Sequence, residues 1–123
     1  MTQPDKLDAA AHDHQPNPLR SSRGTTASFA AASELLRALC APIRAQLVSL
    51  LDEHGPLCVH ELVQSLEVTQ PLVSQHLRIL RSAGVVISER RGREVQYRLA
   101  DDHIAHIVAD AITHSQEQTR SEP

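Results

Sequence analysis

Apolar side chains recur at helical spacing through most of the chain from residue 26 onward. This periodicity predicts a first helix over residues 26–40 and a second over residues 42–53. Pro42 is compatible with the first turn of the second helix, because an N–H at that position would have no partner within the helix. The Gly-Pro pair at 55–56 then ends the second helix.

A short third helix over residues 58–66 and a fourth over residues 70–83 follow, joined by a tight turn with Thr69 as the N-cap of the fourth. Two helices connected in this way, the second basic, are typical of a helix-turn-helix unit that binds DNA. One face of the fourth helix is apolar, and His76 is expected to point inward. The opposite face carries side chains that bond to base edges and phosphates. These predicted DNA-binding residues are Gln70, Ser74, Gln75, Arg78 and Arg81.

Two strands are predicted on either side of Gly92, over residues 85–91 and 93–99. The second alternates apolar and polar side chains, which is typical of a strand with one buried face. The residues at the tip of this hairpin are Arg90, Arg91 and Arg93. A charged turn that serves only solubility is one interpretation of the arginine cluster. Because the hairpin follows the helix-turn-helix directly, we favour the other interpretation, a wing that contacts DNA phosphates.

The stretch from Asp101 to Glu117 predicts a last helix with an apolar stripe and, beside it, a face of carboxylates and imidazoles. His103 and His114 share that face, about 20° apart in angle, but stand roughly 16 Å apart along the axis. One zinc ion held at roughly 2 Å by each imidazole cannot bridge that distance. Two such helices, antiparallel about a two-fold axis, would place the Asp101/His103 end of one against the His114/Glu117 end of the other. The alternative is a polar surface that carries histidines by chance.

Length and composition indicate a small protein with a single domain. The 123 residues suffice for one domain, and its core must be aliphatic because the chain has one Phe, one Tyr and no Trp. A small core of this kind favours an obligate homodimer. Two cysteines are too few for a disulfide framework, no apolar run reaches transmembrane length and no secretory signal is evident. We therefore expect a cytoplasmic protein that does not bind membranes.

Charge is segregated along a chain whose formal net charge is −3. Residues 70–99 carry six arginines and two glutamates, whereas residues 100–123 carry one arginine and five acids. Positive charge concentrated in one segment, residues 70–99, is typical of a surface that binds DNA phosphates. The expected organisation is a flexible N-terminal arm over 1–25, a winged helix-turn-helix domain over 26–117 that dimerises through its first and last helices, and a disordered tail over 118–123.

The order of these elements, from about Ser28 to Glu117, resembles the ArsR/SmtB family of metal-sensing winged-helix repressors, of the zinc-sensor type. The resemblance rests on the motifs LCVHEL (57–62), QPLVSQHLRILRSAGVV (70–86), ERRGREVQYRL (89–99) and the D-x-H…H-x-x-E run over 101–117. It implies a mainly α fold with a small β-hairpin, a winged helix-turn-helix that forms a homodimer. The last motif matches the family's zinc site residue by residue, at Asp101, His103, His114 and Glu117.

The resemblance also implies a possible second metal site, where the third helix meets the N-terminal arm of the partner. Cys58 and Glu61 match positions used there, His60 is nearby, and His12 and His14 are the arm residues that could complete the set. Position 60 is not a cysteine, so arsenite is not the expected ligand. Cys58 alternatively serves as a small buried apolar residue.

The resemblance implies a transcriptional repressor: a metal-free dimer binds operator double-stranded DNA, and zinc bound between the last helices releases it. Zn²⁺ is the expected cofactor, with Co²⁺, Ni²⁺ or Cd²⁺ as alternatives. A second interpretation is a winged-helix regulator that senses one of those other metals or the oxidation of Cys40 and Cys58. A third is a protein-interaction module without an operator. A metal-dependent hydrolase is disfavoured, because a four-ligand site leaves no position for water; we therefore do not expect an enzyme.

Overall fold

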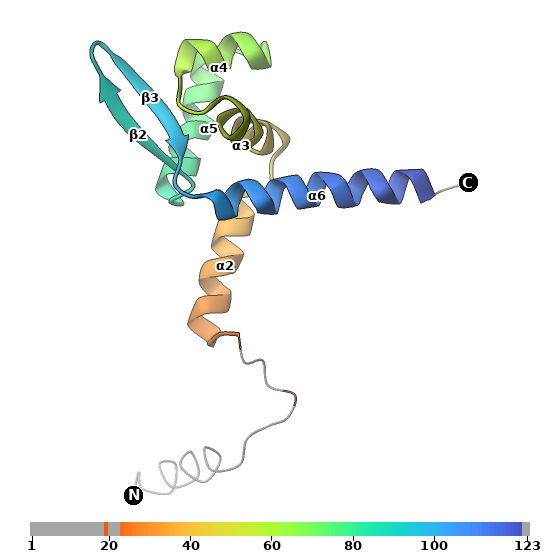
Figure 1. Ribbon diagram of the computed structural model, residues 1–123. Helices are drawn as coiled ribbons and strands as arrows, with labels where there is room; N and C mark the ends of the chain where they lie inside the picture. Colours follow the sequence, from red (N-terminus) through yellow and green to blue (C-terminus); the bar gives the residue numbers. More distant parts are fainter. Residues whose placement is uncertain (1–18, 20–22, 122–123) are drawn as a thin grey trace, which may run out of the picture. The chain divides into compact units, whose positions relative to one another are not determined.

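The computed structural model describes Leu19 and residues 23–121 (Figure 1). Contacts between residues divide the chain into two units, residues 1–30 and 31–123. The division falls within the first described helix, α2 (Thr26–Leu39), whereas the sequence predicted a boundary just before that helix. His12 and His14 lie outside the described residues.

In the first unit, Thr25 caps the start of α2. The Thr25 hydroxyl accepts a hydrogen bond from the Ser28 N–H at 3.2 Å, and the Ser28 hydroxyl accepts one from the Thr25 N–H at 2.7 Å. This reciprocal pair satisfies backbone donors that would otherwise lack partners at the start of a helix. The helix therefore begins at Thr26, where the apolar periodicity predicted it.

The second unit is built around α3 (Pro42–His54), which packs against the helices that follow it, the sheet and α6. In Figure 1, α3 lies between the α4–α5 pair and α6. The helices and strands before α6 begin and end within one residue of the predicted positions, β1 excepted. The elements after α3 are β1 (Leu57–Cys58), α4 (Val59–Leu66), α5 (Gln70–Ser82), β2 (Val86–Arg91), β3 (Glu94–Leu99) and α6 (Asp102–Ser121).

The sheet has three strands in the order β1-β3-β2, each antiparallel to its neighbour. The sequence predicted only the β2–β3 hairpin and assigned Cys58 to the third helix, and that assignment was wrong. In the structure Leu57 pairs with Tyr97 and Cys58 with Gln96, so α4 begins at Val59. A strand of two residues is too short to show an alternation of polar and apolar positions. Its partner is β3, which follows much later in the chain.

The last helix is longer than expected. It continues to Ser121, so residues 118–121, expected in a disordered tail, are helical. Its first half packs on the core, where Ile104, Ala105 and Val108 are buried. Every residue from 109 to 120 is exposed, including Ile112. Like the other described helices, α6 lacks the apolar run that would let it cross a membrane.

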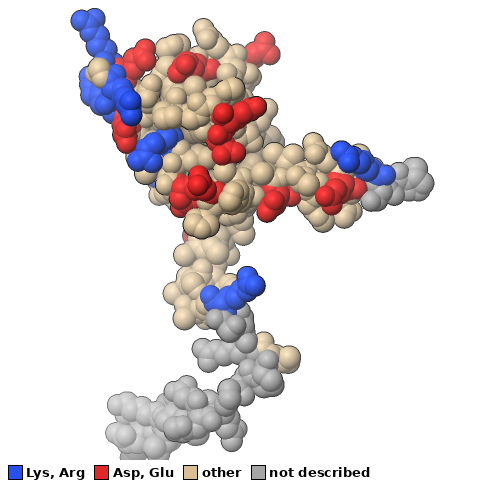
Figure 2. Space-filling view, in the orientation of Figure 1, with Lys and Arg blue, Asp and Glu red and all other residues tan. Residues whose placement is uncertain are grey.

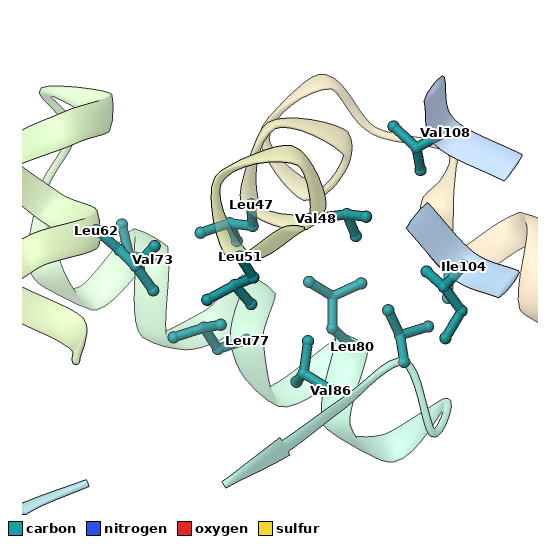
Figure 3. Close-up of a cluster of buried hydrophobic side chains, with 12 residues drawn as sticks. Leu47, Val48, Leu51, Leu62, Val73, Leu77, Leu80, Val86, Ile104 and Val108 are labelled. Atoms are coloured by element: carbon teal, nitrogen blue, oxygen red, sulfur yellow. The ribbon is translucent and has the colours of Figure 1, made fainter. Parts of the chain in front are cut away.

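An aliphatic core joins α3, α4, α5 and α6 (Figure 3). No described polar or charged residue is buried in it. The core residues from α5 are Val73, Leu77 and Leu80, whose spacing i, i+4 and i+7 places them on one face of the helix. Because these three side chains are held in the core, the opposite face of α5 must point outward. The other buried side chains drawn include Leu47, Val48, Leu51, Leu62, Val86, Ile104 and Val108.

Shortening one of these side chains should destabilise the fold. Leu80→Ala is expected to lower the free energy of unfolding by about 2–5 kcal/mol, because a fully buried leucine is removed and a cavity remains. The matched control is Ile79→Ala on the same helix, where the side chain is 37% exposed and the loss should be clearly smaller. Urea unfolding followed by circular dichroism, at one protein concentration, measures both. Equal losses would contradict this orientation of α5.

Candidate DNA interface and metal sites

The predicted DNA-binding face of α5 points to solvent. Four of its residues are exposed and Ser74 is half-buried. The helix cannot rotate this face away without exposing the apolar side chains packed in the core. The result is a surface of amide and guanidinium donors, the groups that bond to base edges and phosphates. The four exposed residues are Gln70, Gln75, Arg78 and Arg81.

Behind this face, Arg44 of α3 connects α5 to the end of α2. Its Nε donates a hydrogen bond to the Ala38 carbonyl at 2.6 Å, and its Nη1 lies 3.2 Å from Nδ1 of His76. A guanidinium has no acceptor, so Nδ1 of His76 accepts this hydrogen bond and the ring proton is on Nε2. His76 is half-buried, in agreement with its predicted inward orientation. Its partner was not predicted, because Arg44 lies in another helix.

Arginine side chains gather over the β2–β3 hairpin at the upper left of Figure 2. The turn closes at Gly92 with a φ of 64°, a left-handed conformation that glycine adopts without a steric penalty. Farther from the turn, Arg98 pairs with Glu89 at 3.2 Å. Three arginines and one glutamate, Glu94, lie beside the turn, so the tip carries a net positive charge. The exposed residues there are Arg90, Arg91 and Arg93, the predicted phosphate-binding set.

Asp101 and His103, two of the predicted zinc ligands, lie together at the start of α6. Asp101 caps the helix, because its Oδ1 accepts hydrogen bonds from the N–H groups of His103 at 2.9 Å and Ile104 at 3.3 Å. The same oxygen lies 3.5 Å from Nδ1 of His103. The His103 side chain is 90% exposed, so its ring is accessible from outside the chain.

His114 and Glu117, the other two predicted ligands, are exposed farther along α6. A single copy of the chain does not bring them to Asp101 and His103, since one straight helix separates the two pairs. Together the four residues offer two imidazole nitrogens and two carboxylate donors, a set that suits a tetrahedral zinc ion. The donors therefore fit zinc, and their meeting requires a second copy.

At the start of α4, Cys58 and Glu61 are joined by hydrogen bonds. The Cys58 N–H donates to Oε1 of Glu61 at 2.9 Å, and the thiol donates to the same oxygen at 3.0 Å. The backbone bond, followed by the thiol bond, holds the pKa of Glu61 below its usual value. Burial, followed by the thiol's own bond to Glu61, raises the pKa of Cys58. Because the thiolate is the reactive form, this environment disfavours a redox role for Cys58.

His60 and Glu94 complete a small group around the Cys58 sulfur. Nδ1 of His60 lies 3.1 Å from Sγ. A carboxylate oxygen of Glu94 joins them, and the donor atoms of all three residues lie within 4.8 Å of one another. Sequence reasoning placed Cys58 and His60 in a candidate second metal site but missed Glu94. The signal that would have identified it is the pairing of β1 with β3, since that pairing brings Glu94 next to Cys58.

Comparisons with known proteins agree with this architecture. A family model described as "Bacterial regulatory protein, arsR family" matches residues 41–88. The HTH-type transcriptional repressor SmtB of Mycobacterium tuberculosis is 64% identical over 87 residues, which are 71% of this chain and 64% of that protein, so the chain spans less than two thirds of that relative's length. The HTH-type transcriptional regulator NmtR of the same species is 38% identical over 87 residues, covering 71% of this chain and 72% of the regulator.

A solved structure gives the same fold. The solution structure of the homodimeric winged helix-turn-helix DNA-binding domain Mb0332 from Mycobacterium bovis has a TM-score of 0.68 and 26% identity. The match covers 80% of this chain and 89% of that domain. The winged helix-turn-helix fold predicted from the order of elements is therefore confirmed.

Arg44 should contribute more to stability than a surface arginine. Arg44→Met is expected to lower the free energy of unfolding by about 1–3 kcal/mol, because it removes charged hydrogen bonds to Ala38 and His76. The control is Arg37→Met, whose partner Glu34 is exposed, and its loss should stay below about 1 kcal/mol. Thermal and urea unfolding measure both variants. If Arg44→Met is no more destabilised than Arg37→Met, the connection between α2 and α5 does not stabilise the fold.

Proposed function

Because the chain belongs to the ArsR/SmtB family of bacterial regulatory proteins, we propose that it is a DNA-binding transcriptional repressor controlled by zinc. In the proposed cycle, the metal-free homodimer binds an operator in double-stranded DNA, and the zinc-bound dimer leaves it. The observation that carries the proposal is the presence of exposed donor pairs, Asp101/His103 and His114/Glu117, toward opposite ends of one helix. The similarity to SmtB, a transcriptional repressor, supports it.

An apolar groove between α2 and α6 offers a surface for the second copy. It has a volume of about 460 Å³ and is lined mainly by aliphatic side chains of the two helices. Leu36 and Ile112, which line it, are 53% and 44% exposed. Such a surface is stabilised when another apolar surface covers it. Pairing two α6 helices antiparallel about a two-fold axis covers the groove in both copies.

In that pairing, each end of α6 meets the opposite end of the partner helix. With 20 residues, α6 is about 30 Å long, and His103 and His114 stand roughly 16 Å apart along it. Asp101 and His103 of one copy then lie against the His114 and Glu117 positions of the other, twice per dimer. Zinc bound between them would supply a cross-link between the two copies. Co²⁺, Ni²⁺ and Cd²⁺ accept related donor sets, so the same site admits them with different affinities.

A short backbone path connects these ligands to the DNA-binding helix. Asp101 follows Ala100, whose N–H donates to the Val85 carbonyl at 2.9 Å, and the Val85 N–H donates to the Leu80 carbonyl at 2.9 Å. A change in the direction of α6 at its first residue is thereby transmitted to the end of α5 and the start of β2. Metal binding lowers the DNA affinity only if the dimer has one arrangement that binds DNA and another that does not, and if the metal binds the second more tightly. DNA must then weaken metal binding by the same factor.

Removing one imidazole should uncouple the metal from the DNA. In the unmodified chain, zinc is expected to lower the affinity for DNA by about 5–150-fold. His103→Ala and His114→Gln should each abolish that response while leaving metal-free DNA binding unchanged, because neither residue lies on the α5 face. His106→Ala, an exposed histidine of the same helix, should respond normally. Fluorescence anisotropy of a labelled duplex from upstream of the chain's own gene measures release. Normal release in both ligand variants would contradict the proposed site.

Loss of a base contact on α5 should weaken DNA binding without affecting metal binding. Gln70→Ala and Ser74→Ala are each expected to cost about 1–3 kcal/mol of binding free energy per lost base contact. Gln46→Ala, an exposed amide on α3, serves as the control and should bind as tightly as the unmodified chain. The same anisotropy assay, in metal-free buffer at fixed salt, gives the three affinities. Wild-type affinity in both α5 variants would show that another face reads the operator.

A further inference from the structure

A cavity between α2 and α5 is separate from the metal ligands and from the groove between α2 and α6. Its volume is about 840 Å³. It is lined by α2 from Ala31 onward, which belongs to the second unit, by Arg44 of α3 and by the last turns of α5. The α6 metal ligands and Cys58 are not among the residues that line it. A cavity of this size is within the range of small-molecule binding sites, about 300–1,000 Å³.

The walls of this cavity are mainly apolar. Leu35 and Ala38 line it on the α2 side, and Ile79 and Ala83 line it on the α5 side. Leu35 is half-buried and Ile79 is 37% exposed, so both retain apolar surface in contact with water. Covering such surface with an apolar group is favourable. The body of a ligand that fits this cavity is therefore apolar.

Three arginines line the same cavity, and two of them keep donors that no described residue accepts. Arg37 is paired with Glu34, which also lines the cavity, so that pair carries no net charge. Arg44 uses two of its five N–H groups in its bonds to α2 and α5, which leaves three without a partner among the described residues. Arg78 makes no hydrogen bond or ion pair with a described residue. The cavity therefore carries two positive charges that no described carboxylate neutralises.

Apolar walls and unpaired guanidiniums together select one class of ligand. Two positive charges in a partly apolar cleft attract anions strongly, because the walls screen charge less than water does. Guanidiniums bind carboxylates through charged hydrogen bonds, and the Ser82 hydroxyl on the same lining adds a further donor. An inorganic anion would leave the apolar walls in contact with water, and a neutral apolar molecule would leave the arginines unpaired. A molecule with both an anionic group and an apolar body satisfies both parts of the lining.

We infer that this cavity binds an organic anion that has an apolar body and one carboxylate or sulfonate group. The anionic group pairs with Arg44 and Arg78, and the body packs between Leu35 and Ile79. Arg78 also belongs to the proposed DNA-binding face of α5, so a bound anion withdraws one cation from DNA. The ligand therefore lowers the affinity for DNA, and DNA lowers the affinity for the ligand by the same factor. Ligand binding itself does not rest on the function proposed above, whereas its effect on DNA does.

Fluorescence titration of the metal-free full chain with 8-anilinonaphthalene-1-sulfonate tests the cavity, because this probe joins a sulfonate to an apolar body and brightens when it leaves water. We expect saturable binding of one probe per chain. Naphthalene-1-carboxylate should displace the probe, whereas uncharged naphthalene-1-methanol and inorganic phosphate, at matched concentration and ionic strength, should not. Displacement by the methanol as effective as that by the carboxylate would show that the arginines play no part. Equally effective displacement by phosphate would show that the apolar walls play none, and either result would overturn the inference.

Two arginines of α5 provide matched variants. Arg78→Gln is expected to weaken probe binding about tenfold or more, because a charged hydrogen bond is lost. Arg81→Gln removes the same charge from the same helix, but Arg81 does not line the cavity, so probe binding should be unchanged. Both side chains are exposed, so both variants should keep the far-ultraviolet circular dichroism of the unmodified chain. Equal probe affinity in the two variants would overturn the inference. A loss confined to Ile112→Gln would also overturn it, since the probe would then occupy the groove between α2 and α6.

DNA binding provides the second measurement. Saturating naphthalene-1-carboxylate should raise the dissociation constant of the labelled duplex at least about fivefold at fixed salt. The His103→Ala/His114→Gln chain should show the same shift, because neither imidazole lines the cavity. An unchanged dissociation constant would refute the effect of the ligand on DNA. A chain that binds the probe but no duplex would support the cavity as a binding site and contradict the proposed function.

Discussion

Burial of aliphatic side chains around α3 is the interaction on which the rest of the structure depends. Leu47, Val48 and Leu51 of α3 are buried among side chains from α4, α5, the sheet and α6. Each functional surface is the outer side of an element whose inner side lies in this core. The polar face of α5 points outward because Val73 and Leu77 are held inward. The histidines of α6 stay exposed for the same reason, since buried side chains fix the orientation of that helix.

The two halves of α6 have different surroundings, and in the proposed function this difference connects metal binding with dimer formation. The first half is anchored in the core. The second half is exposed, and its residue Ile112 lines the apolar groove. In the proposed dimer, one helix supplies both the contact between copies and the metal ligands. A ligand that holds two helices together also restricts their crossing angle. The backbone hydrogen bonds at Ala100 and Val85 place the end of α5, the proposed DNA-binding helix, next to the start of α6.

The β1–β3 pairing is short, yet it determines the surroundings of Cys58. It places the sulfur opposite Gln96 of β3 and near Glu94, at the turn end of the hairpin. The carboxylate of Glu94 adds to the effects of burial and of Glu61 in raising the pKa of the Cys58 thiol. The strand pairing also joins the arginine-tipped hairpin to the first helix of the helix-turn-helix. The two surfaces expected to contact DNA are therefore linked by the β1–β3 strand pair as well as by the core.

Local sequence patterns were sufficient to predict most of the helices and strands of this protein. Helical periodicity, together with the helix-ending and turn residues Pro42, Gly55 and Gly92, predicted the helices before α6 and the hairpin to within one residue, because those signals act between near neighbours in the chain. It also placed the α6 donors on one face. The tertiary structure alone decided which distant residues meet: β1 with β3, Arg44 with His76 across 32 positions, and Glu94 with Cys58. Periodicity along the sequence does not predict such contacts, because they depend on how all the helices and strands pack around the core.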